Sequence, residues 1–207
     1  MLAIVDYGVG NLYSLASSLK CIGVDHVIAA EGKQLREADS IILPGVGAFA
    51  DAARKLELSG MREVLLAEVK KGKPLLGICL GMQMLFDKSY EYGEHDGLGL
   101  IPGQVCPLTD DISPALKVPH IGWNRLDIVK ADPLFRYFSS GQHVYYVHSL
   151  YAKNCAEFTL ATSDYSVPVT GVVRRGNVYG TQFHPEKSGA AGLNLLRAFA
   201  GMQEGAK

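Results

Sequence analysis

The feature that most constrains this chain is an apolar run at residues 74–78 that leads into the pattern Gly77-Ile78-Cys79-Leu80-Gly81. A run without polar side chains is typical of a strand buried on both faces of a parallel sheet. Residues 81–86 then resume a helical pattern. Glycines two positions before and two positions after Cys79 permit a tight turn, because the backbone must approach itself closely there. The pattern predicts strand, sharp turn and helix, with Cys79 at the turn.

The first half of the chain alternates apolar runs with amphipathic stretches. Strands are expected at residues 2–6, 26–30, 40–43 and 74–78, and helices at residues 12–22, 48–56, 61–71 and 81–86. Glycine-rich turns follow the first and third strands. This alternation indicates an α/β fold with a mostly parallel central sheet and flanking helices.

The second half is richer in glycine and proline and in short β-type segments. Strands are expected at residues 123–129, 143–147, 158–162, 167–174 and 177–182, a last helix at 188–200, and fraying over 202–207. The chain contains no internal repeat, low-complexity segment or linker. We therefore expect one domain spanning residues 1–207, with a strand-rich C-terminal half.

Composition excludes several classes of function. Hydrophobic residues make up 48% and charged residues 20%, as in ordinary globular proteins, and the net charge is −1. A nucleic-acid-binding domain would show a basic excess. The N-terminus lacks the features of a signal peptide, so a cytoplasmic protein is expected. The turn Gly8-Val9-Gly10 lacks the third glycine of a dinucleotide-binding fingerprint, so we expect no nucleotide and no other cofactor.

Four cysteines are present, and none has the C-x-x-C spacing of a zinc or redox site. We expect no bound metal, because no cluster has ligand spacing. Free cysteines are usually small buried hydrophobes. Cys79 differs, because its pattern is the cysteine form of a nucleophile elbow. The turn would project the sulfur at the carboxyl edge of the sheet and at a helix N-terminus, where the helix dipole favours thiolate.

A thiolate nucleophile needs a proton carrier, and His184 is the best candidate among six histidines. It follows a β-type run in the sequence His184-Pro185-Glu186. Pro185 fixes the chain so that the Glu186 carboxylate can accept the proton on the far ring nitrogen and set the tautomer. His143 and His148 alternate with aromatic residues on an expected strand, and packing suffices to explain them.

Backbone amides complete the predicted site. The amide of Leu80, directly after the nucleophile, is placed to donate to a developing oxyanion. A second donor normally comes from a loop after another strand. The segment Gly45-Val46-Gly47 follows the third strand, and its glycines let the backbone approach a ligand. We therefore expect the amides of Val46 and Leu80 to form an oxyanion hole.

These segments together resemble the class I (triad) glutamine amidotransferases, whose signatures are the G-x-C-x-G elbow, a following glutamine (here Gln83) and a distant H-P-E. Within that family the sequence is similar to the glutaminase subunits of imidazole glycerol phosphate synthases over almost its whole length. The segments that carry the closer resemblance include DYGVGN at residues 6–11, PGVGAF at 44–49, PHIGWN at 119–124, YVHS at 146–149 and HPEKS at 184–188.

The resemblance implies that glutamine is hydrolysed through a Cys79 thioester. The ammonia would pass to a (β/α)₈-barrel cyclase subunit that makes imidazole glycerol phosphate and the purine precursor AICAR in histidine biosynthesis. It further implies a substrate pocket formed by Gly47, Gln83, His148, Ser149 and Leu150. The implied interface with the cyclase subunit contains Asn11, Trp123, Tyr145 and Lys187.

Three other hypotheses remain open at this point. The chain could be the glutaminase subunit of another synthetase, such as anthranilate or GMP synthetase. It could be a Cys-His peptidase or γ-glutamyl hydrolase of the same fold, which would need no partner. A catalytically inert binding protein would be expected to lose Cys79 or His184, and both are present.

Overall fold

The computed structural model describes residues 1–202; the fraying expected over residues 202–207 falls, but for residue 202, outside the described part. The helices are α1 (Leu12–Cys21), α2 (Gly32–Glu37), α3 (Phe49–Leu58), α4 (Met61–Lys70), α5 (Leu80–Gln83) and α6 (Gly189–Gly201), with 3₁₀ turns η1 (Leu108–Asp110), η2 (Pro133–Phe135) and η3 (Pro185–Lys187). The strands are β1 (Leu2–Val5), β2 (His26–Ala29), β3 (Ser40–Leu43), β4 (Leu75–Ile78), β5 (Phe86–Ser89), β6 (His95–Asp96), β7 (Ile101–Pro107), β8 (His120–Arg125), β9 (Asp127–Ile128), β10 (His143–His148), β11 (Leu150–Lys153), β12 (Thr159–Asp164), β13 (Pro168–Arg175) and β14 (Val178–Thr181).

The central sheet has eight strands in the order β2-β1-β3-β4-β14-β13-β12-β9. The pairs from β2 to β14 are parallel, and those from β14 to β9 are antiparallel. In β4, Leu75 and Leu76 pair with β3 on one side and with β14 on the other. Because all four β4 residues are buried, the continuous apolar run fits this central position.

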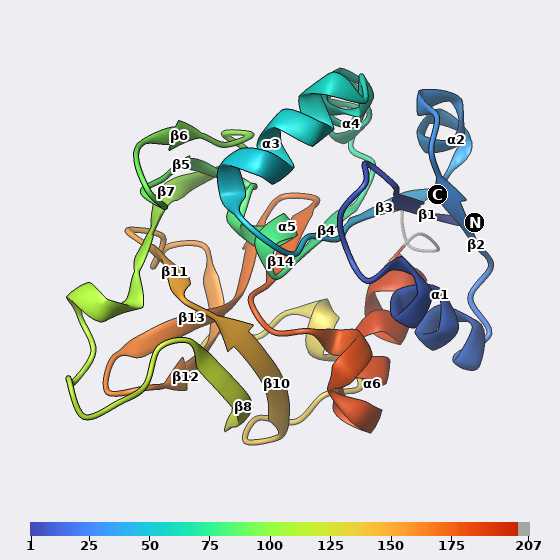
Figure 1. The fold of residues 1–207 in the computed structure, drawn as a ribbon. Helices are drawn as coiled ribbons and strands as arrows, with labels where there is room; N and C mark the ends of the chain where they lie inside the picture. Colours follow the sequence, from blue (N-terminus) through green and yellow to red (C-terminus); the bar gives the residue numbers. More distant parts are fainter. Residues whose placement is uncertain (203–207) are drawn as a thin grey trace.

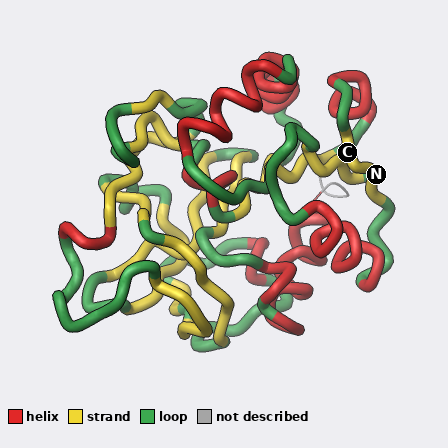
Figure 2. The backbone as a smooth tube through the Cα atoms, viewed as in Figure 1, coloured by secondary structure: helices red, strands yellow, loops and turns green. Residues whose placement is uncertain are grey.

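Helices cover both faces of the parallel part of the sheet (Figure 1), and the layers are clearest in the tube view (Figure 2). Successive residues of β1 point to opposite faces, as strand geometry requires. Ala3 and Val5 join a core with residues of α2, α3 and α4, whereas Leu2 and Ile4 join a second core with residues of α1 and α6. The sheet is therefore buried between two helical layers, which is the expected α/β arrangement.

Two smaller sheets extend the strand-rich half. Strands β8 and β10 form an antiparallel ribbon, and β11, β7, β5 and β6 form a four-stranded sheet. In the ribbon, His148 pairs with His120 and Tyr145 pairs with Trp123. On β8, His120 is buried while Ile121 and Trp123 are exposed, so the strand has one inner and one outer face.

Several expected elements differ from the structure. The helix expected at 81–86 is wrong in length, because α5 contains only Leu80–Gln83 and Phe86 begins β5. Every residue from Leu80 to Phe86 is buried, so the hydrophobic pattern does not show where the helix ends and the strand begins. The strand expected at 123–129 is displaced and divided into β8 and β9. Helix α2 and strands β5, β6, β7 and β11 were not expected. Among the described residues, no helix is long and apolar enough to cross a membrane.

Candidate active site

Cys79 lies at the junction of β4 and α5, in a backbone conformation that residues other than glycine rarely adopt. Its φ is +55° and its ψ is −110°. Its amide donates to the Thr181 carbonyl at 2.7 Å, which fixes the turn against β14. Strain of this kind persists only where the surrounding structure enforces it, and it is concentrated at functional sites. The side chain is 7% exposed and reaches the floor of a pocket.

The two elbow glycines are required by close backbone approach. A Cβ on Gly77 would lie 2.6 Å from the Gly81 carbonyl oxygen, and a Cβ on Gly81 would lie 1.9 Å from the Leu43 oxygen. A Cβ on Gly45 would lie 2.7 Å from the Gly81 amide nitrogen. The end of β3 and the loop after it thus pack directly against the start of α5. This contact brings the segment that contains Val46 close to Leu80, the residue after Cys79. The oxyanion hole expected from the amides of Val46 and Leu80 stays a prediction.

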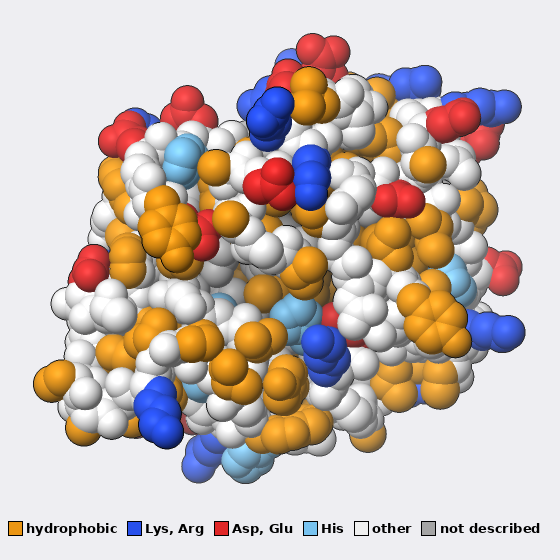
Figure 3. Space-filling model, in the orientation of Figure 1, with side chains coloured by type: hydrophobic (Ala, Val, Ile, Leu, Met, Phe, Trp, Pro, Cys, Tyr) orange, Lys and Arg blue, Asp and Glu red, His pale blue; other side chains and the backbone are white. Residues whose placement is uncertain are grey.

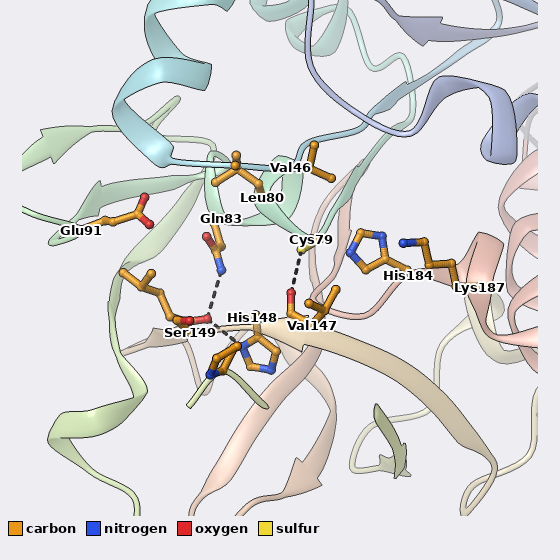
Figure 4. A pocket seen from close by; sticks show the side chains of 13 residues that line it. Val46, Cys79, Leu80, Gln83, Glu91, Val147, His148, Ser149, His184 and Lys187 are labelled. Carbon is orange, nitrogen blue, oxygen red and sulfur yellow. Dashed lines mark hydrogen bonds between the residues drawn. The ribbon is translucent and has the colours of Figure 1, made fainter. Parts of the chain in front are cut away.

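The expected contribution of a helix dipole at Cys79 is small. Helix α5 has only four residues. Because the macrodipole sums over aligned peptide units, so short a helix adds little charge at its N-terminus. The positive charge available to a thiolate therefore comes from His184, whose ring faces Cys79 across the pocket (Figure 4).

His184 and Glu186 are joined by a buried ion pair. Nδ1 of His184 lies 2.8 Å from Oε1 of Glu186, and both side chains are less than 5% exposed. Pro185 begins η3 directly after His184, so the turn brings the carboxylate back to the ring. Burial alone would lower the pKa of His184, but hydrogen bonds with Cys79 and Glu186 raise the pKa to about 9. The imidazole is therefore held in the charged form beside the sulfur.

The second oxygen of Glu186 has no hydrogen-bond partner within the described chain. Glu186 lines a small cavity of about 10 Å³ that is also lined by Asn11, Gly45 and Val46. That volume is near the minimum that holds one water molecule. The carboxylate of the pair thus borders both the first βα turn and the Val46 loop.

The pocket above Cys79 has a volume of about 390 Å³. Its lining includes all five residues expected to contact substrate: Gly47, Gln83, His148, Ser149 and Leu150. Gln83 Nε2 donates to the Leu150 carbonyl and to Gln182 Oε1, both at 3.1 Å. The side chains converge on one cavity from α5, β10, β11 and the loop after β3 (Figure 4). The size suits a small amino acid or its derivative.

Over residues 3–200 the chain matches the family described as glutamine amidotransferase class-I. The chain belongs to the class I glutamine amidotransferases. Relatives include imidazole glycerol phosphate synthase subunit HisH of Listeria monocytogenes, which is 46% identical over 199 residues and covers 96% of this chain and 94% of the relative. The HisH subunit of Lacticaseibacillus casei is 49% identical over 204 residues, with 99% and 97% covered.

Solved structures agree on the fold of this glutamine amidotransferase. One, described only as a glutamine amidotransferase, has a TM-score of 0.76 at 19% identity and covers 98% of both chains. A chain of PurLQS from Thermotoga maritima has a TM-score of 0.73 at 19% identity, with 97% of each chain covered. At these identities the likeness concerns architecture alone.

Sequence reasoning missed two polar residues at the site, Glu91 on the pocket wall and Gln182 buried behind Cys79. Gln182 is fully buried, and its Nε2 lies 3.9 Å from the Cys79 sulfur. Glu91 lines the pocket from the turn after β5, and its carboxylate accepts a hydrogen bond from the Phe49 amide. Gln182 is two residues before His184, which was a usable signal, but Glu91 lies on a turn that no periodicity marks.

Of the four residues expected at a partner interface, only Lys187 lines the pocket; Asn11 lines the small cavity beside Glu186, and Trp123 and Tyr145 are paired on β8 and β10. Trp123 is 56% exposed, and its ring meets Tyr145 at a centroid distance of 6.1 Å. Asn11 caps α1 by accepting from the Ser14 amide at 3.4 Å. Lys187 lines the pocket beside His184. In the space-filling view, hydrophobic side chains gather over β8 and β10 next to a central hollow (Figure 3).

The described part of the chain contains no group of three or more His, Cys, Asp or Glu side chains that could hold a metal ion. Cys21 is exposed and Cys155 is buried, and both are free thiols.

Proposed function

We propose that this chain is the glutaminase subunit of an imidazole glycerol phosphate synthase, working as a single domain in the cytoplasm. It hydrolyses glutamine to glutamate and ammonia. Two lines of support are the relatives named as HisH subunits, at 46–49% identity over nearly the whole chain, and the pocket lined by Cys79 and His184, with Glu186 hydrogen-bonded to the far side of the His184 ring. The second is the observation that carries the mechanism.

Cys79 is the proposed nucleophile, and His184 carries the proton. The thiolate attacks the side-chain carbonyl carbon of glutamine, and the carbonyl electrons move to oxygen. The amides of Val46 and Leu80 donate to that oxyanion. Imidazolium His184 gives its proton to the amide nitrogen, and ammonia leaves as the glutamyl thioester forms. Water then attacks the thioester carbon, with neutral His184 accepting its proton. The C–S bond breaks, which regenerates the Cys79 thiolate and imidazolium His184, and glutamate is released.

Glutamine is held by groups whose charge complements an amino acid. Free glutamine carries an α-ammonium and an α-carboxylate. Glu91 provides a carboxylate on the pocket wall, which suits the ammonium group. Gln83, Ser149 and the Leu150 segment provide neutral hydrogen-bonding groups, and Gly47, at φ +91°, adds a backbone with open space above it.

The ammonia is delivered to a separate cyclase subunit. Ammonia is mostly protonated in water and is then not nucleophilic, so a producer gains from a closed path to its consumer. The acceptor is a (β/α)₈-barrel subunit that forms imidazole glycerol phosphate and AICAR in histidine biosynthesis. Its docking surface on this chain comprises Asn11, Trp123, Tyr145 and Lys187.

Replacement of Cys79 tests the proposal. Cys79→Ala removes the nucleophile, so glutamine hydrolysis is expected to fall about 10⁴-fold or more, and His184→Ala nearly as far. Glu186→Gln should have a smaller effect, because it orients the ring. Glutamate release is measured with and without a cyclase subunit, and circular dichroism controls for folding. Substantial activity in Cys79→Ala, or turnover of γ-glutamyl peptides in preference to glutamine, would contradict the proposal.

A further inference from the structure

Two buried histidines beside the pocket take no part in the mechanism above. His120 on β8 and His148 on β10 are 4% and 5% exposed, and Nδ1 of His120 lies 2.9 Å from Nε2 of His148. The His120 ring is stacked between Tyr146 and Tyr165, at centroid distances of 4.7 and 4.0 Å. Burying two imidazoles in contact is unfavourable unless their hydrogen bonds are matched.

The hydrogen-bond partners at the two ends determine where the protons are. At one end, Nδ1 of His148 faces the Leu150 carbonyl at 2.8 Å, and a carbonyl can only accept. At the other end, Oδ1 of Asn124 accepts a hydrogen bond from the backbone amide of Arg125 at 2.8 Å. The other terminal atom of the Asn124 side chain is therefore the nitrogen, Nδ2. That Nδ2 donates to the Asp164 carbonyl at 2.9 Å and faces Nε2 of His120 at 3.3 Å.

Only one proton arrangement satisfies all these contacts. His148 carries its proton on Nδ1, so its Nε2 accepts from Nδ1–H of His120. Nε2 of His120 then accepts from Asn124. A further proton on either ring would turn a donor toward a donor, at the His120–His148 contact or at Asn124. The geometry therefore holds both rings neutral and in a single tautomer each.

We propose that Asn124 and His120 are positioning residues that fix the tautomer and ring orientation of His148 and, through it, the glutamine pocket. His148 lines the pocket. The Leu150 carbonyl that accepts a hydrogen bond from Nδ1–H of His148 also accepts one from Nε2 of Gln83. The ordered chain from Asn124 to Leu150 thus holds three pocket residues in place. The inference deepens the proposed glutaminase function and rests on it.

Charge near the catalytic pair supports this assignment. Burial lowers the pKa of His120 to about 4 and of His148 to about 3, and the nearby His120 and His184 further disfavour charge on His148. Because His184 is held as the imidazolium, a second charged ring at the pocket would compete for the same thiolate and carboxylate. A neutral His148 avoids that competition.

A pair of variants of equal size isolates the hydrogen bond from the packing. His120→Asn and His120→Leu both remove the stacked ring, but only asparagine retains a donor near the position of Nδ1. The KM for glutamine is measured in the full chain with a cyclase subunit present. It is expected to be about tenfold higher in His120→Leu than in His120→Asn, with kcat changing less. Tyr165→Phe, which keeps a ring stacked on His120, should leave KM at the parent value.

A spectroscopic test on the parent chain needs neither turnover nor a variant that folds. Nitrogen-15 correlation spectra of the imidazole rings should show His120 and His148 as neutral Nδ1–H tautomers down to about pH 5.5. An Nε2–H tautomer at either ring, or equal KM values in the Asn and Leu variants, overturns the inference. Absence of glutaminase activity in the parent overturns the proposed function instead, and the spectra then still decide the assignment of protons.

Discussion

At the scale of single residues, the charge on His184 sets the pH range in which the proposed chemistry works. Hydrogen bonds with Cys79 and Glu186 overcome burial and hold its pKa at about 9, above its ordinary value of 6.5. The ring is therefore protonated below about pH 9 and loses its proton above it. Since the departing ammonia needs that proton, kcat/KM for glutamine should fall about tenfold per pH unit above pH 9. Initial rates between pH 7 and 10.5 measure this fall, the alkaline limb of the pH profile.

The control for this prediction is Glu186→Gln. The carboxylate is one cause of the raised pKa, so its neutral replacement should move the alkaline limb to lower pH. A substitution far from the pocket, such as Lys33→Ala on the exposed face of α2, should leave the limb in place. If the alkaline limb of kcat/KM has the same midpoint pH in Glu186→Gln as in the parent, the titrating group is not His184.

The sequence allowed only part of this residue-scale description. Cys79 could be found because its glycines are local, and Glu186 because Pro185 returns it to the ring two residues away. Glu91 reaches the pocket from a turn that contacts a residue 42 positions earlier in the chain, through the hydrogen bond from the Phe49 amide. No local pattern encodes such a contact. The shortness of α5, which removes the expected dipole, depends likewise on the tertiary packing of Phe86.

At the scale of elements, α6 packs against η3, the turn that follows His184 and carries Glu186, two residues of the proposed catalytic triad. Gly192 lies where the helix touches the turn, and a Cβ there would lie 1.9 Å from the Pro185 carbonyl oxygen. Gly192→Ala should therefore push α6 away and lower the free energy of unfolding by about 3 kcal/mol. It should also reduce glutaminase activity, because Pro185 connects His184 to Glu186. Urea denaturation and initial rates measure the two effects.

The same helix supplies a matched control. Gly201 is also in α6, but among residues 1–202 a Cβ there would have no neighbour within 4 Å. Gly201→Ala should raise the stability by up to about 1 kcal/mol, since alanine favours the helix. Equal effects of the two substitutions would contradict the role assigned to the contact at Gly192.

Elements with a clear local pattern were the ones that the sequence could predict. Strand β3 agrees with expectation because it is a short apolar run stopped by Pro44-Gly45, and the first residues of α1 and α4 agree because amphipathic stretches begin there. Strand β7 was missed because it begins Ile101-Pro102-Gly103, and proline and glycine argue against a strand. Gly103 adopts φ +141° and packs against the Lys153 carbonyl, a close approach that sequence alone does not reveal.

At the scale of the whole molecule, the pocket opens beside an exposed apolar face. Ile121 and Trp123 are 58% and 56% exposed on the outer side of β8, while His120 and Asn124 lie on its inner side. Val46, in the loop proposed to stabilise the oxyanion, is 42% exposed. One strand thus connects a surface suited to a partner with the wall of the pocket.

Lys187 is the residue through which docking should reach the triad most directly. It directly follows Glu186, its backbone amide donates to the His184 carbonyl at 3.1 Å, and its side chain lines the pocket. A carboxylate of the cyclase subunit that binds Lys187 would therefore act on η3 within one residue of the triad. We expect low basal hydrolysis that rises when the cyclase subunit carries its ligand, because free hydrolysis would waste glutamine. Lys187→Ala should lower this stimulation about tenfold, and Lys33→Ala, on distant α2, should not. Binding by titration calorimetry and stimulated rates are measured together, and a Lys187→Ala chain that binds and responds as the parent does would remove Lys187 from the coupling.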